Sequence, residues 1–180
     1  RRDPVCDSCP RGPRIMSPLR SQSRRVLFAL PRIKRETFVR HADLHRTIDS
    51  TNNRAMEWAA REDAQLPLLV LTENQTAGKG RGTNVWWSSP GALTFSLVLD
   101  VAGRESGAES WPRFALAAAV AICESLEAAA PGVLFGIRWP NDVCCDRRKI
   151  CGVLPELHLG ASPRVVLGIG LHAYYSMEGA

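Results

Sequence analysis

Residues 93–99 alternate strictly between large apolar and smaller side chains, which is the two-residue period of a β-strand. This segment follows a long polar stretch, residues 72–90, in which every second residue from 78 to 82 is glycine. A helix would follow such glycines in a dinucleotide-binding fold, so the order of segments excludes that fold. The Gly-Lys-Ser/Thr ending of a P-loop is also missing. We expect a half-buried strand whose apolar face carries Leu93, Phe95, Leu97 and Leu99.

The other apolar runs predict a sheet with few helices. Pro67 opens a short run, residues 68–71, whose length suits a buried strand. Several strands are joined by turns rather than by helices, so the predicted class is α+β, with a mixed, largely antiparallel sheet and helices on one face. Further strands are predicted at residues 44–48, 133–138, 150–159 and 165–171, and helices at residues 53–61 and 111–130.

The polar stretch carries the first candidate site, which consists of Gln75, the run Gly78-Lys79-Gly80-Arg81-Gly82 and Trp86. Glycines let the backbone approach a ligand closely, and the two cations add positive charge where backbone amides already face an anion. Such a loop suits a phosphate or an acyl phosphate. The alternative is a flexible surface linker, which Trp86 disfavours because an aromatic side chain in a linker has nothing to pack against.

A second candidate site is the run Arg138-Trp139-Pro140-Asn141-Asp142, followed seven residues later by Lys149. It comes directly after a predicted strand, where binding residues are often placed. Asp142 could orient a cation or a ligand amine, or hold Lys149 charged. Lys149 could neutralise a carboxylate that attacks a phosphorus centre. The alternative is a plain β-turn with Lys149 as a solvated charge.

The third candidate is Asp49-Ser50-Thr51-Asn52, which precedes a predicted helix. Side-chain oxygens of these types accept hydrogen bonds from the unpaired amides of a first helical turn. Helix capping alone therefore accounts for the pattern, and a ligand-binding role is the competing interpretation.

The net charge of +5 is concentrated at the start of the chain. Residues 1–40 hold eleven Lys or Arg against three acids, whereas the remainder holds twelve against fifteen. Residues 1–24 are rich in Arg, Pro and Ser, so we expect a disordered basic leader there and one catalytic domain over residues 25–180. A nucleic-acid arm is an alternative for the leader, but no helix-turn-helix pattern accompanies it.

The cysteines do not resemble a disulfide framework, since two of the six, Cys144 and Cys145, are adjacent. Reduced thiols in a cytoplasmic protein are the simplest interpretation. No apolar run approaches the roughly 20 residues that cross a bilayer, so we expect no membrane contact. Cys6 and Cys9 could begin a zinc site with His41 and His45, but the gap between the pairs is far longer than the roughly 12–15 residues of a zinc finger.

Taken in order, these segments resemble the biotin–protein ligases. That family's pattern is Asp-Ser-Thr-Asn, then a Gly-Lys/Arg-Gly-Arg-Gly loop ending in Trp and Ser-Pro, then Lys-Trp-Pro-Asn-Asp, a lysine seven residues on, and Gly-Ile/Val-Leu. The matching segments here are residues 49–52, 78–90, 138–142, Lys149 and residues 152–154, within a resemblance that spans residues 44–171. The implied fold is the class II aminoacyl-synthetase-like fold of biotin and lipoate ligases.

The resemblance implies an enzyme that uses ATP and Mg²⁺ to make biotinyl-5′-adenylate and then transfers biotin to a lysine of a biotin carboxyl carrier protein. Ser50, Thr51, Asn52 and Gln75 would bind the ureido end of biotin. The loop residues Lys79, Gly80 and Arg81 would close over the ligands, and Trp86 would wall the adenylate site. Asn141 and Asp142 would serve the ATP–magnesium or carrier-lysine side, and Lys149 would contact the biotin carboxyl and the phosphate. The predicted catalytic residues are thus Arg81, Asp142 and Lys149, without a metal held by the protein.

The chain departs from the family pattern at two places. Arg138 stands where the family has lysine, and His172 where it has asparagine. The small C-terminal β-barrel and the DNA-binding domain of some members are missing, so we expect a C-terminally truncated catalytic domain and no binding to DNA. The alternatives are a lipoate or octanoate ligase or transferase of the same fold, and a catalytically impaired biotin-binding fragment.

Overall fold

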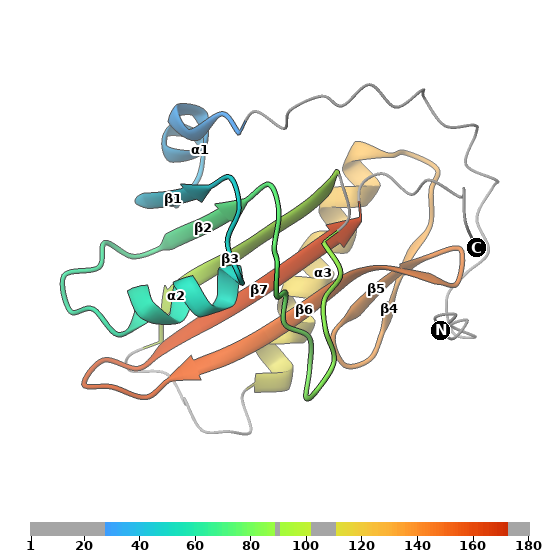
Figure 1. The fold of residues 1–180 in the computed structure, drawn as a ribbon. Helices are drawn as coiled ribbons and strands as arrows, with labels where there is room; N and C mark the ends of the chain where they lie inside the picture. Colours follow the sequence, from blue (N-terminus) through green and yellow to red (C-terminus); the bar gives the residue numbers. More distant parts are fainter. Residues whose placement is uncertain (1–27, 89–90, 102–110, 173–180) are drawn as a thin grey trace.

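The computed structural model describes residues 28–88, 91–101 and 111–172. Within them one sheet has the strand order β1-β2-β3-β7-β6-β5-β4, with β1 and β2 parallel and every other neighbouring pair antiparallel (Figure 1). This confirms the predicted mixed, largely antiparallel sheet. The strands are β1 (His41–His45), β2 (Leu68–Thr72), β3 (Ala92–Asp100), β4 (Phe135–Arg138), β5 (Asp142–Cys145), β6 (Arg148–His158) and β7 (Arg164–His172).

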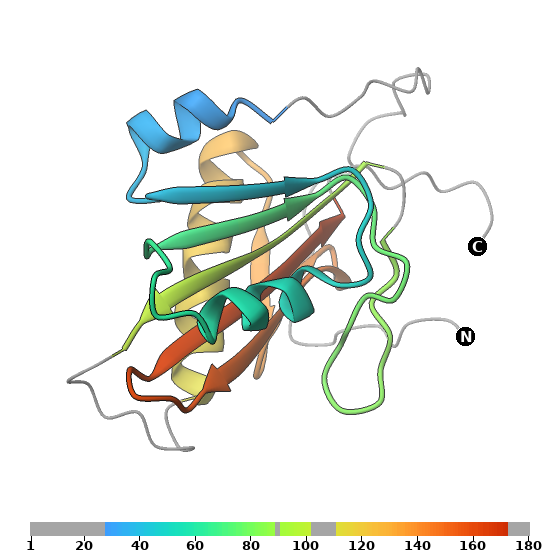
Figure 2. The same ribbon diagram turned by 60° about the vertical axis from the view of Figure 1, so that its left-hand side comes forward.

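The three described helices cover both faces of the sheet. The long helix α3 (Trp111–Ala129) crosses one face, and the short helix α1 (Leu30–Glu36) packs at the β1–β2 end of that same face. Helix α2 (Thr51–Ala59) packs on the opposite face, against β2, β3 and β7, as Figures 1 and 2 show. The two helices predicted from the sequence, which correspond to α2 and α3, were expected on one face but lie on opposite faces.

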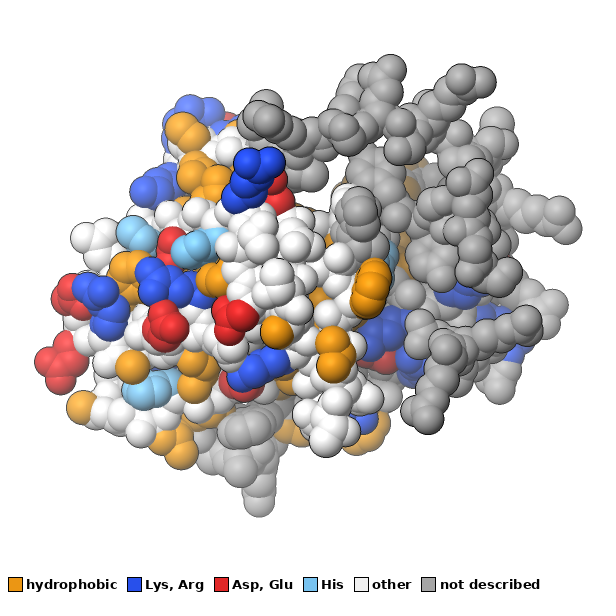
Figure 3. All heavy atoms as spheres, viewed as in Figure 1, with side chains coloured by type: hydrophobic (Ala, Val, Ile, Leu, Met, Phe, Trp, Pro, Cys, Tyr) orange, Lys and Arg blue, Asp and Glu red, His pale blue; other side chains and the backbone are white. Residues whose placement is uncertain are grey.

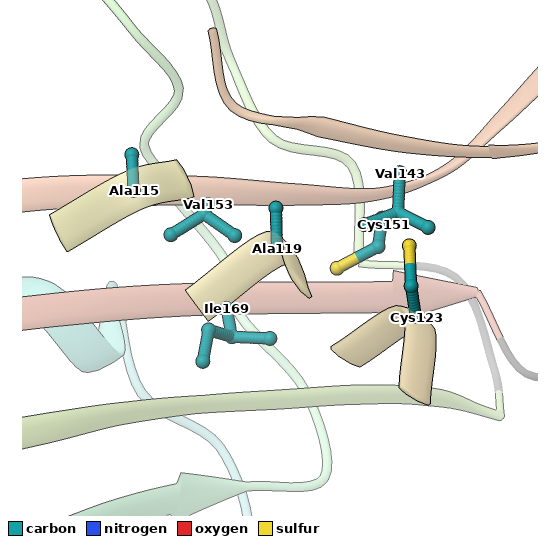
Figure 4. Close-up of a cluster of buried hydrophobic side chains, with 7 residues drawn as sticks. All are labelled: Ala115, Ala119, Cys123, Val143, Cys151, Val153 and Ile169. Carbon is teal, nitrogen blue, oxygen red and sulfur yellow. The ribbon is translucent and has the colours of Figure 1, made fainter. Parts of the chain in front are cut away.

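The core between α3 and the sheet is built from small helical residues against β-branched strand residues (Figure 4). Ala115 and Ala119 are almost fully buried, and their size lets the helix lie close to Val153 and Ile169. Cys151 is a free thiol in this cluster, and burial raises its pKa to about 12. It therefore behaves as a small apolar side chain at neutral pH.

Strand β3 is buried on both faces rather than on one. Its face with Phe95 and Leu97 packs toward α1 and α3, as predicted. The other face was expected to be the exposed one, yet Thr94 is 3% exposed and Ser96 is 0% exposed. That expectation was wrong because α2 covers this face, which also forms the floor of a pocket.

Several element boundaries differ from the prediction. Strand β1 lies three residues earlier than expected, because it pairs with β2 over its whole length from His41 to His45. Strand β5 was not predicted. The turn that joins it to β6 uses Asp146 and Arg147 with φ of 49° and 65°, a geometry usually indicated by Asn-Gly or Asp-Gly. Helix α1 was also not predicted, and the expected leader, residues 1–24, lies outside the described residues.

Candidate functional site

The α2 side of the sheet carries a cavity of about 420 Å³. The three segments singled out in the sequence, which are far apart along the chain, all line it. Two residues that the sequence did not single out line it as well, since Gly168 and Gly170 occupy alternate positions of β7 directly beneath the cavity. The predicted residues that line this cavity are Ser50, Thr51, Asn52, Gln75, Lys79, Gly80, Arg81, Trp86, Asn141, Asp142 and Lys149.

The amino end of α2 enters the cavity without the capping pattern that its sequence suggests. Ser50 occupies the N-cap position, but its side chain makes no capping hydrogen bond. The backbone N–H of Thr51 instead donates to Oε1 of Gln75, at 2.6 Å. A residue of the glycine-rich segment thus satisfies the helix end, so plain helix capping does not account for Ser50.

The floor of the cavity is a chain of polar side chains between α2, β3 and β6. Ser96 Oγ lies 2.8 Å from Thr51 Oγ1 and 2.6 Å from Asn52 Oδ1. The Asn52 amide donates to Glu156 Oε2 at 2.6 Å and to the Leu154 carbonyl at 3.3 Å. The side-chain amide of Asn52 is therefore held by protein groups at both its nitrogen and its oxygen. Glu156, Ser96 and Thr94 were missed because polar residues on a strand face look solvent-exposed until a helix is seen to cover them.

Two glycines of β7 leave room for this arrangement. A Cβ at Gly168 would overlap Asn52 Oδ1, and a Cβ at Gly170 would overlap the Trp86 ring. Glycine is disfavoured inside a strand, where it often marks the close approach of another group. Glycines at every second strand position were therefore an available sequence indication of the cavity floor.

Three charged side chains meet at the β5–β6 end of the cavity. Asp142 accepts a hydrogen bond from Arg138 Nη2 at 2.7 Å through one oxygen, and its other oxygen lies 2.8 Å from Lys149 Nζ. Asn141 is fixed nearby by a 2.8 Å hydrogen bond from its amide to the Val153 carbonyl. The two cations and one carboxylate leave this end with a net positive charge, which suits an anionic group.

The glycine-rich segment forms a closed turn rather than an open linker. Gly80 N–H donates to the Asn84 carbonyl and Trp86 N–H to the Gly78 carbonyl, both at 2.9 Å. At Gly78 a Cβ would lie 2.5 Å from the Trp86 carbonyl oxygen, so only glycine fits there. Arg81 lies in this turn and is exposed at the cavity rim.

Trp86 connects that turn to the sheet. Its ring lies over Gly170 and stacks on His172, with ring centroids 4.7 Å apart. Lys149 Nζ lies 5.9 Å from the centroid of the Trp86 ring, within the distance of a cation–π interaction. The surface-linker alternative is therefore contradicted, since this aromatic ring packs as part of the cavity wall.

Helix α2 is anchored at its outer face and at its carboxyl end. Asp43 of β1 accepts hydrogen bonds from Arg54 Nε at 2.8 Å and Trp58 Nε1 at 2.6 Å. Arg164 of β7 is 7% exposed and donates to carbonyls at the end of the helix, at 3.0 Å for Ala59. Figure 3 shows basic, acidic and histidine side chains intermingled over β1 and α2. These contacts fix the helix that carries Thr51 and Asn52.

No group of three or more His, Cys, Asp or Glu side chains is placed to hold a metal ion among the described residues. His41 instead packs against the Trp58 ring, with centroids 5.0 Å apart, and His45 Nε2 lies 2.9 Å from Asp43 Oδ1. Cys6 and Cys9, the other half of the zinc alternative, lie outside the described residues. In the same described part of the chain, no helix is long and apolar enough to cross a membrane.

Residues 44–171 match the model of the biotin/lipoate A/B protein ligase family. The chain belongs to this family. It is 34% identical over 143 residues to the bifunctional ligase/repressor BirA of Bacillus subtilis, covering 78% of this chain and 42% of that protein. It is 32% identical over 143 residues to the biotin–[acetyl-CoA-carboxylase] ligase of Mycobacterium tuberculosis, covering 77% of this chain and 52% of that protein. This family member thus spans about half the length of these relatives.

Solved structures of the family share the fold. The biotin protein ligase of Aquifex aeolicus in complex with biotin and ATP has a TM-score of 0.62 and 28% identity, over 77% of this chain and 56% of that one. A lipoate protein ligase-like protein of Thermoplasma acidophilum with bound lipoic acid has a TM-score of 0.52 at 12% identity, over 77% of this chain and 70% of that one, which shows the fold alone. The predicted class II synthetase-like fold is confirmed.

Proposed function

We propose that this chain is the catalytic core of a biotin–protein ligase. Biotin and ATP would react to give biotinyl-5′-adenylate and pyrophosphate, and a lysine of a biotin carboxyl carrier protein would then take the biotinyl group. The observation that carries the proposal is the convergence of Ser50, Arg81 and Lys149 on one cavity. Relatives named as biotin ligases and a neighbour that binds both biotin and ATP support the same function.

The cavity offers different chemistry to the two ends of biotin. Ser50, Thr51 and Gln75 supply neutral hydrogen-bonding groups at the α2 end, which suit the neutral ureido ring. Lys149 and Arg138 supply positive charge at the β5–β6 end. That end suits the biotin carboxylate and the phosphate that it attacks.

In the first step a carboxylate oxygen attacks the α-phosphorus of ATP, and the bond to pyrophosphate breaks. Two anions must approach each other, so fixed cations lower the barrier. Lys149 would take this role, and its ion pair with Asp142, which holds the ammonium group at the cavity, supports the proposal. Arg81, at the rim, would come close to the phosphate when the whole glycine-rich turn moves over the cavity.

In the second step the carrier lysine amine attacks the acyl carbon, and AMP leaves. The adenylate would hydrolyse if water reached it, which gives the turn around Lys79, Gly80 and Arg81 a purpose as a cover. Trp86 would wall the adenylate, and Asn141 would border the path of the carrier lysine. We propose a biotin carboxyl carrier protein as the macromolecular partner.

Magnesium, which the resemblance implies together with ATP, does not fit a site formed by the described residues alone. Both oxygens of Asp142 are engaged by cations, and no cluster of carboxylates lies near them in the described part of the chain. We therefore assign no residue to Mg²⁺ and route no step through it. The four described cysteines are free thiols, which supports a reducing compartment such as the cytoplasm.

Titration calorimetry with biotin, followed by ATP, tests the proposal, with mass spectrometry of the products. We expect biotin to bind, and ATP then to yield biotinyl-adenylate and one pyrophosphate. Lipoate and octanoate are titrated in parallel. An acyl-adenylate formed only from lipoate or octanoate would reverse the assignment, and biotin binding without pyrophosphate release would show a binding fragment rather than an enzyme.

A further inference from the structure

Glu156 lies beside the cavity without lining it. This residue of β6 is 104 positions from Asn52 in sequence, yet its Oε2 accepts a 2.6 Å hydrogen bond from the Asn52 amide. Its Oε1 lies 3.9 Å from Lys79 Nζ in the glycine-rich turn. Glu156 therefore contacts both the floor of the cavity and the segment that borders it.

The contacts of Asn52 leave its side-chain amide one orientation. The Leu154 carbonyl and the Glu156 carboxylate are both acceptors, so they must face the amide N–H groups of Asn52. With both amide hydrogens engaged, Oδ1 is turned toward Ser96. A rotated amide would place oxygen against two acceptors, which costs the hydrogen bonds and adds repulsion.

The orientation of Asn52 also determines which hydrogen bonds Ser96 can make with Thr51. A serine hydroxyl has a single hydrogen, and Oδ1 of Asn52 can only accept, so the hydrogen of Ser96 is committed to the 2.6 Å contact with Asn52. The single hydrogen of the Thr51 hydroxyl then points to a protein oxygen, either Ser96 Oγ at 2.8 Å or Gln75 Oε1 at 3.1 Å. Gln75 Oε1 also accepts the 2.6 Å hydrogen bond from the Thr51 backbone N–H.

The Thr51 hydroxyl therefore presents a hydrogen-bond acceptor to the cavity. Its hydroxyl hydrogen points inward to protein oxygens, so a lone pair is the group left for a ligand. A cyclic urea carries N–H groups that complement this acceptor, whereas a dithiolane ring or an alkyl chain carries none. At the Thr51 end of the cavity, the direction of hydrogen bonding, and not only the shape of the ligand, therefore distinguishes a cyclic urea from the other two groups.

We propose that Glu156 is a positioning residue that sets the direction of hydrogen bonds along Asn52, Ser96 and Thr51, and so selects a ligand that donates an N–H. The inference rests on the proposed function and deepens it, because it explains why the cavity takes the ureido ring. Glu156 acts through Asn52 and does not touch the ligand.

The test compares biotin with its two cyclic carbamate analogues, in each of which a ring oxygen replaces one ureido N–H. The affinities of wild type, Glu156→Gln and Ser96→Ala are measured by calorimetry. Glutamine can donate as well as accept, so it no longer holds Asn52 in one orientation. Glu127→Gln, at an exposed position of α3, is the matched control.

We expect wild type to bind one analogue at least about tenfold more weakly than biotin, and we expect that ratio to fall by about fivefold in Glu156→Gln. The Glu127→Gln control keeps the wild-type ratio. If Glu156→Gln loses the same affinity for biotin and for both analogues, Glu156 has a merely structural role. That result, or a wild type that binds all three ligands equally well, would overturn this inference but not the proposed function. Wild type that binds no biotin overturns the proposed function as well.

Ser96→Ala keeps the inference testable if the Glu156 variant does not fold. This change removes the hydroxyl between Asn52 and Thr51 and leaves Glu156 in place. The same fall in the ligand ratio supports the inference, and an unchanged ratio contradicts it.

Discussion

Lys149 Nζ lies 2.8 Å from Oδ1 of Asp142 on the neighbouring strand, and the second oxygen of that carboxylate is bound by Arg138. The lysine is thus held at the cavity by a partner that is itself fixed. A side chain as long as lysine loses much rotamer freedom when it is placed in this way. The conformational entropy of the lysine is therefore lost on folding, before any ligand binds.

Lys149→Ala is therefore expected to slow adenylate formation by about 100-fold or more while leaving the fold intact, since a fixed charge at a reacting anion contributes on that scale. Asp142 keeps Arg138 as a partner, so the free energy of unfolding should change by under about 1 kcal/mol. Pyrophosphate release and urea unfolding measure the two effects. Lys34→Ala, at an exposed position of α1, is the control. An unfolded Lys149 variant contradicts the assignment.

Alanine substitutions at the two glycines of β7 are expected to weaken the binding of different ligands. Gly168→Ala displaces Asn52, and Gly170→Ala displaces Trp86, because the added methyl groups overlap them. Overpacking of this kind costs roughly 1–3 kcal/mol. We expect the first change to weaken biotin about tenfold or more, and the second to weaken a nonhydrolysable ATP analogue measured at saturating biotin. Each variant serves as the control for the other. If each variant weakened biotin and the ATP analogue equally, the cavity would not have separate ends for the two ligands.

Arg164→Leu should destabilise the protein by roughly 2–3 kcal/mol, since it removes charged hydrogen bonds to carbonyls that end α2. Leucine keeps most of the buried volume, so the loss reflects the missing donors. Urea unfolding measures it. Arg46→Leu, at an exposed position after β1, should change stability by under about 0.5 kcal/mol. Equal stabilities of the two variants would show that the α2 end does not depend on Arg164.

Asp43 should give the protein an acid-sensitive contribution to stability. Burial favours a higher pKa for Asp43, but hydrogen bonds from Trp58, Arg54 and His45 outweigh it, so the pKa lies below its ordinary value. The contribution is therefore complete above the unfolded pKa of about 3.9 and is lost as the pH falls through the lower folded value.

Urea unfolding of Asp43→Asn between pH 7 and pH 2 tests this contribution. We expect lower stability than wild type at pH 7 and a smaller decline below about pH 4. Glu62→Gln, at an exposed position, should follow the wild-type curve. Parallel curves for wild type and Asp43→Asn would contradict the expected acid dependence.

The sequence indicated the apolar strands and the candidate site better than it indicated the helix arrangement. Alternation over residues 93–99 and the apolar run before residue 72 correspond to β3 and β2 because burial sets both patterns. The side of the sheet taken by α2 was not predictable, since Ala55 and Ala59 would pack equally well on either face. Glu156 was missed for a related reason: its role depends on Asn52, which only tertiary structure brings near.

The last strand of the described sheet, β7, is also its middle strand, between β3 and β6. During synthesis the strands β1–β3 and β4–β6 can each associate among themselves, but they have no shared neighbour until residues 164–172 leave the ribosome. The candidate cavity is lined by residues from both halves, so we expect it to hold a ligand only after the halves have joined. Pulse-labelled chains arrested before residue 164 should therefore be unable to retain ligand, which makes retention a practical assay for completed assembly.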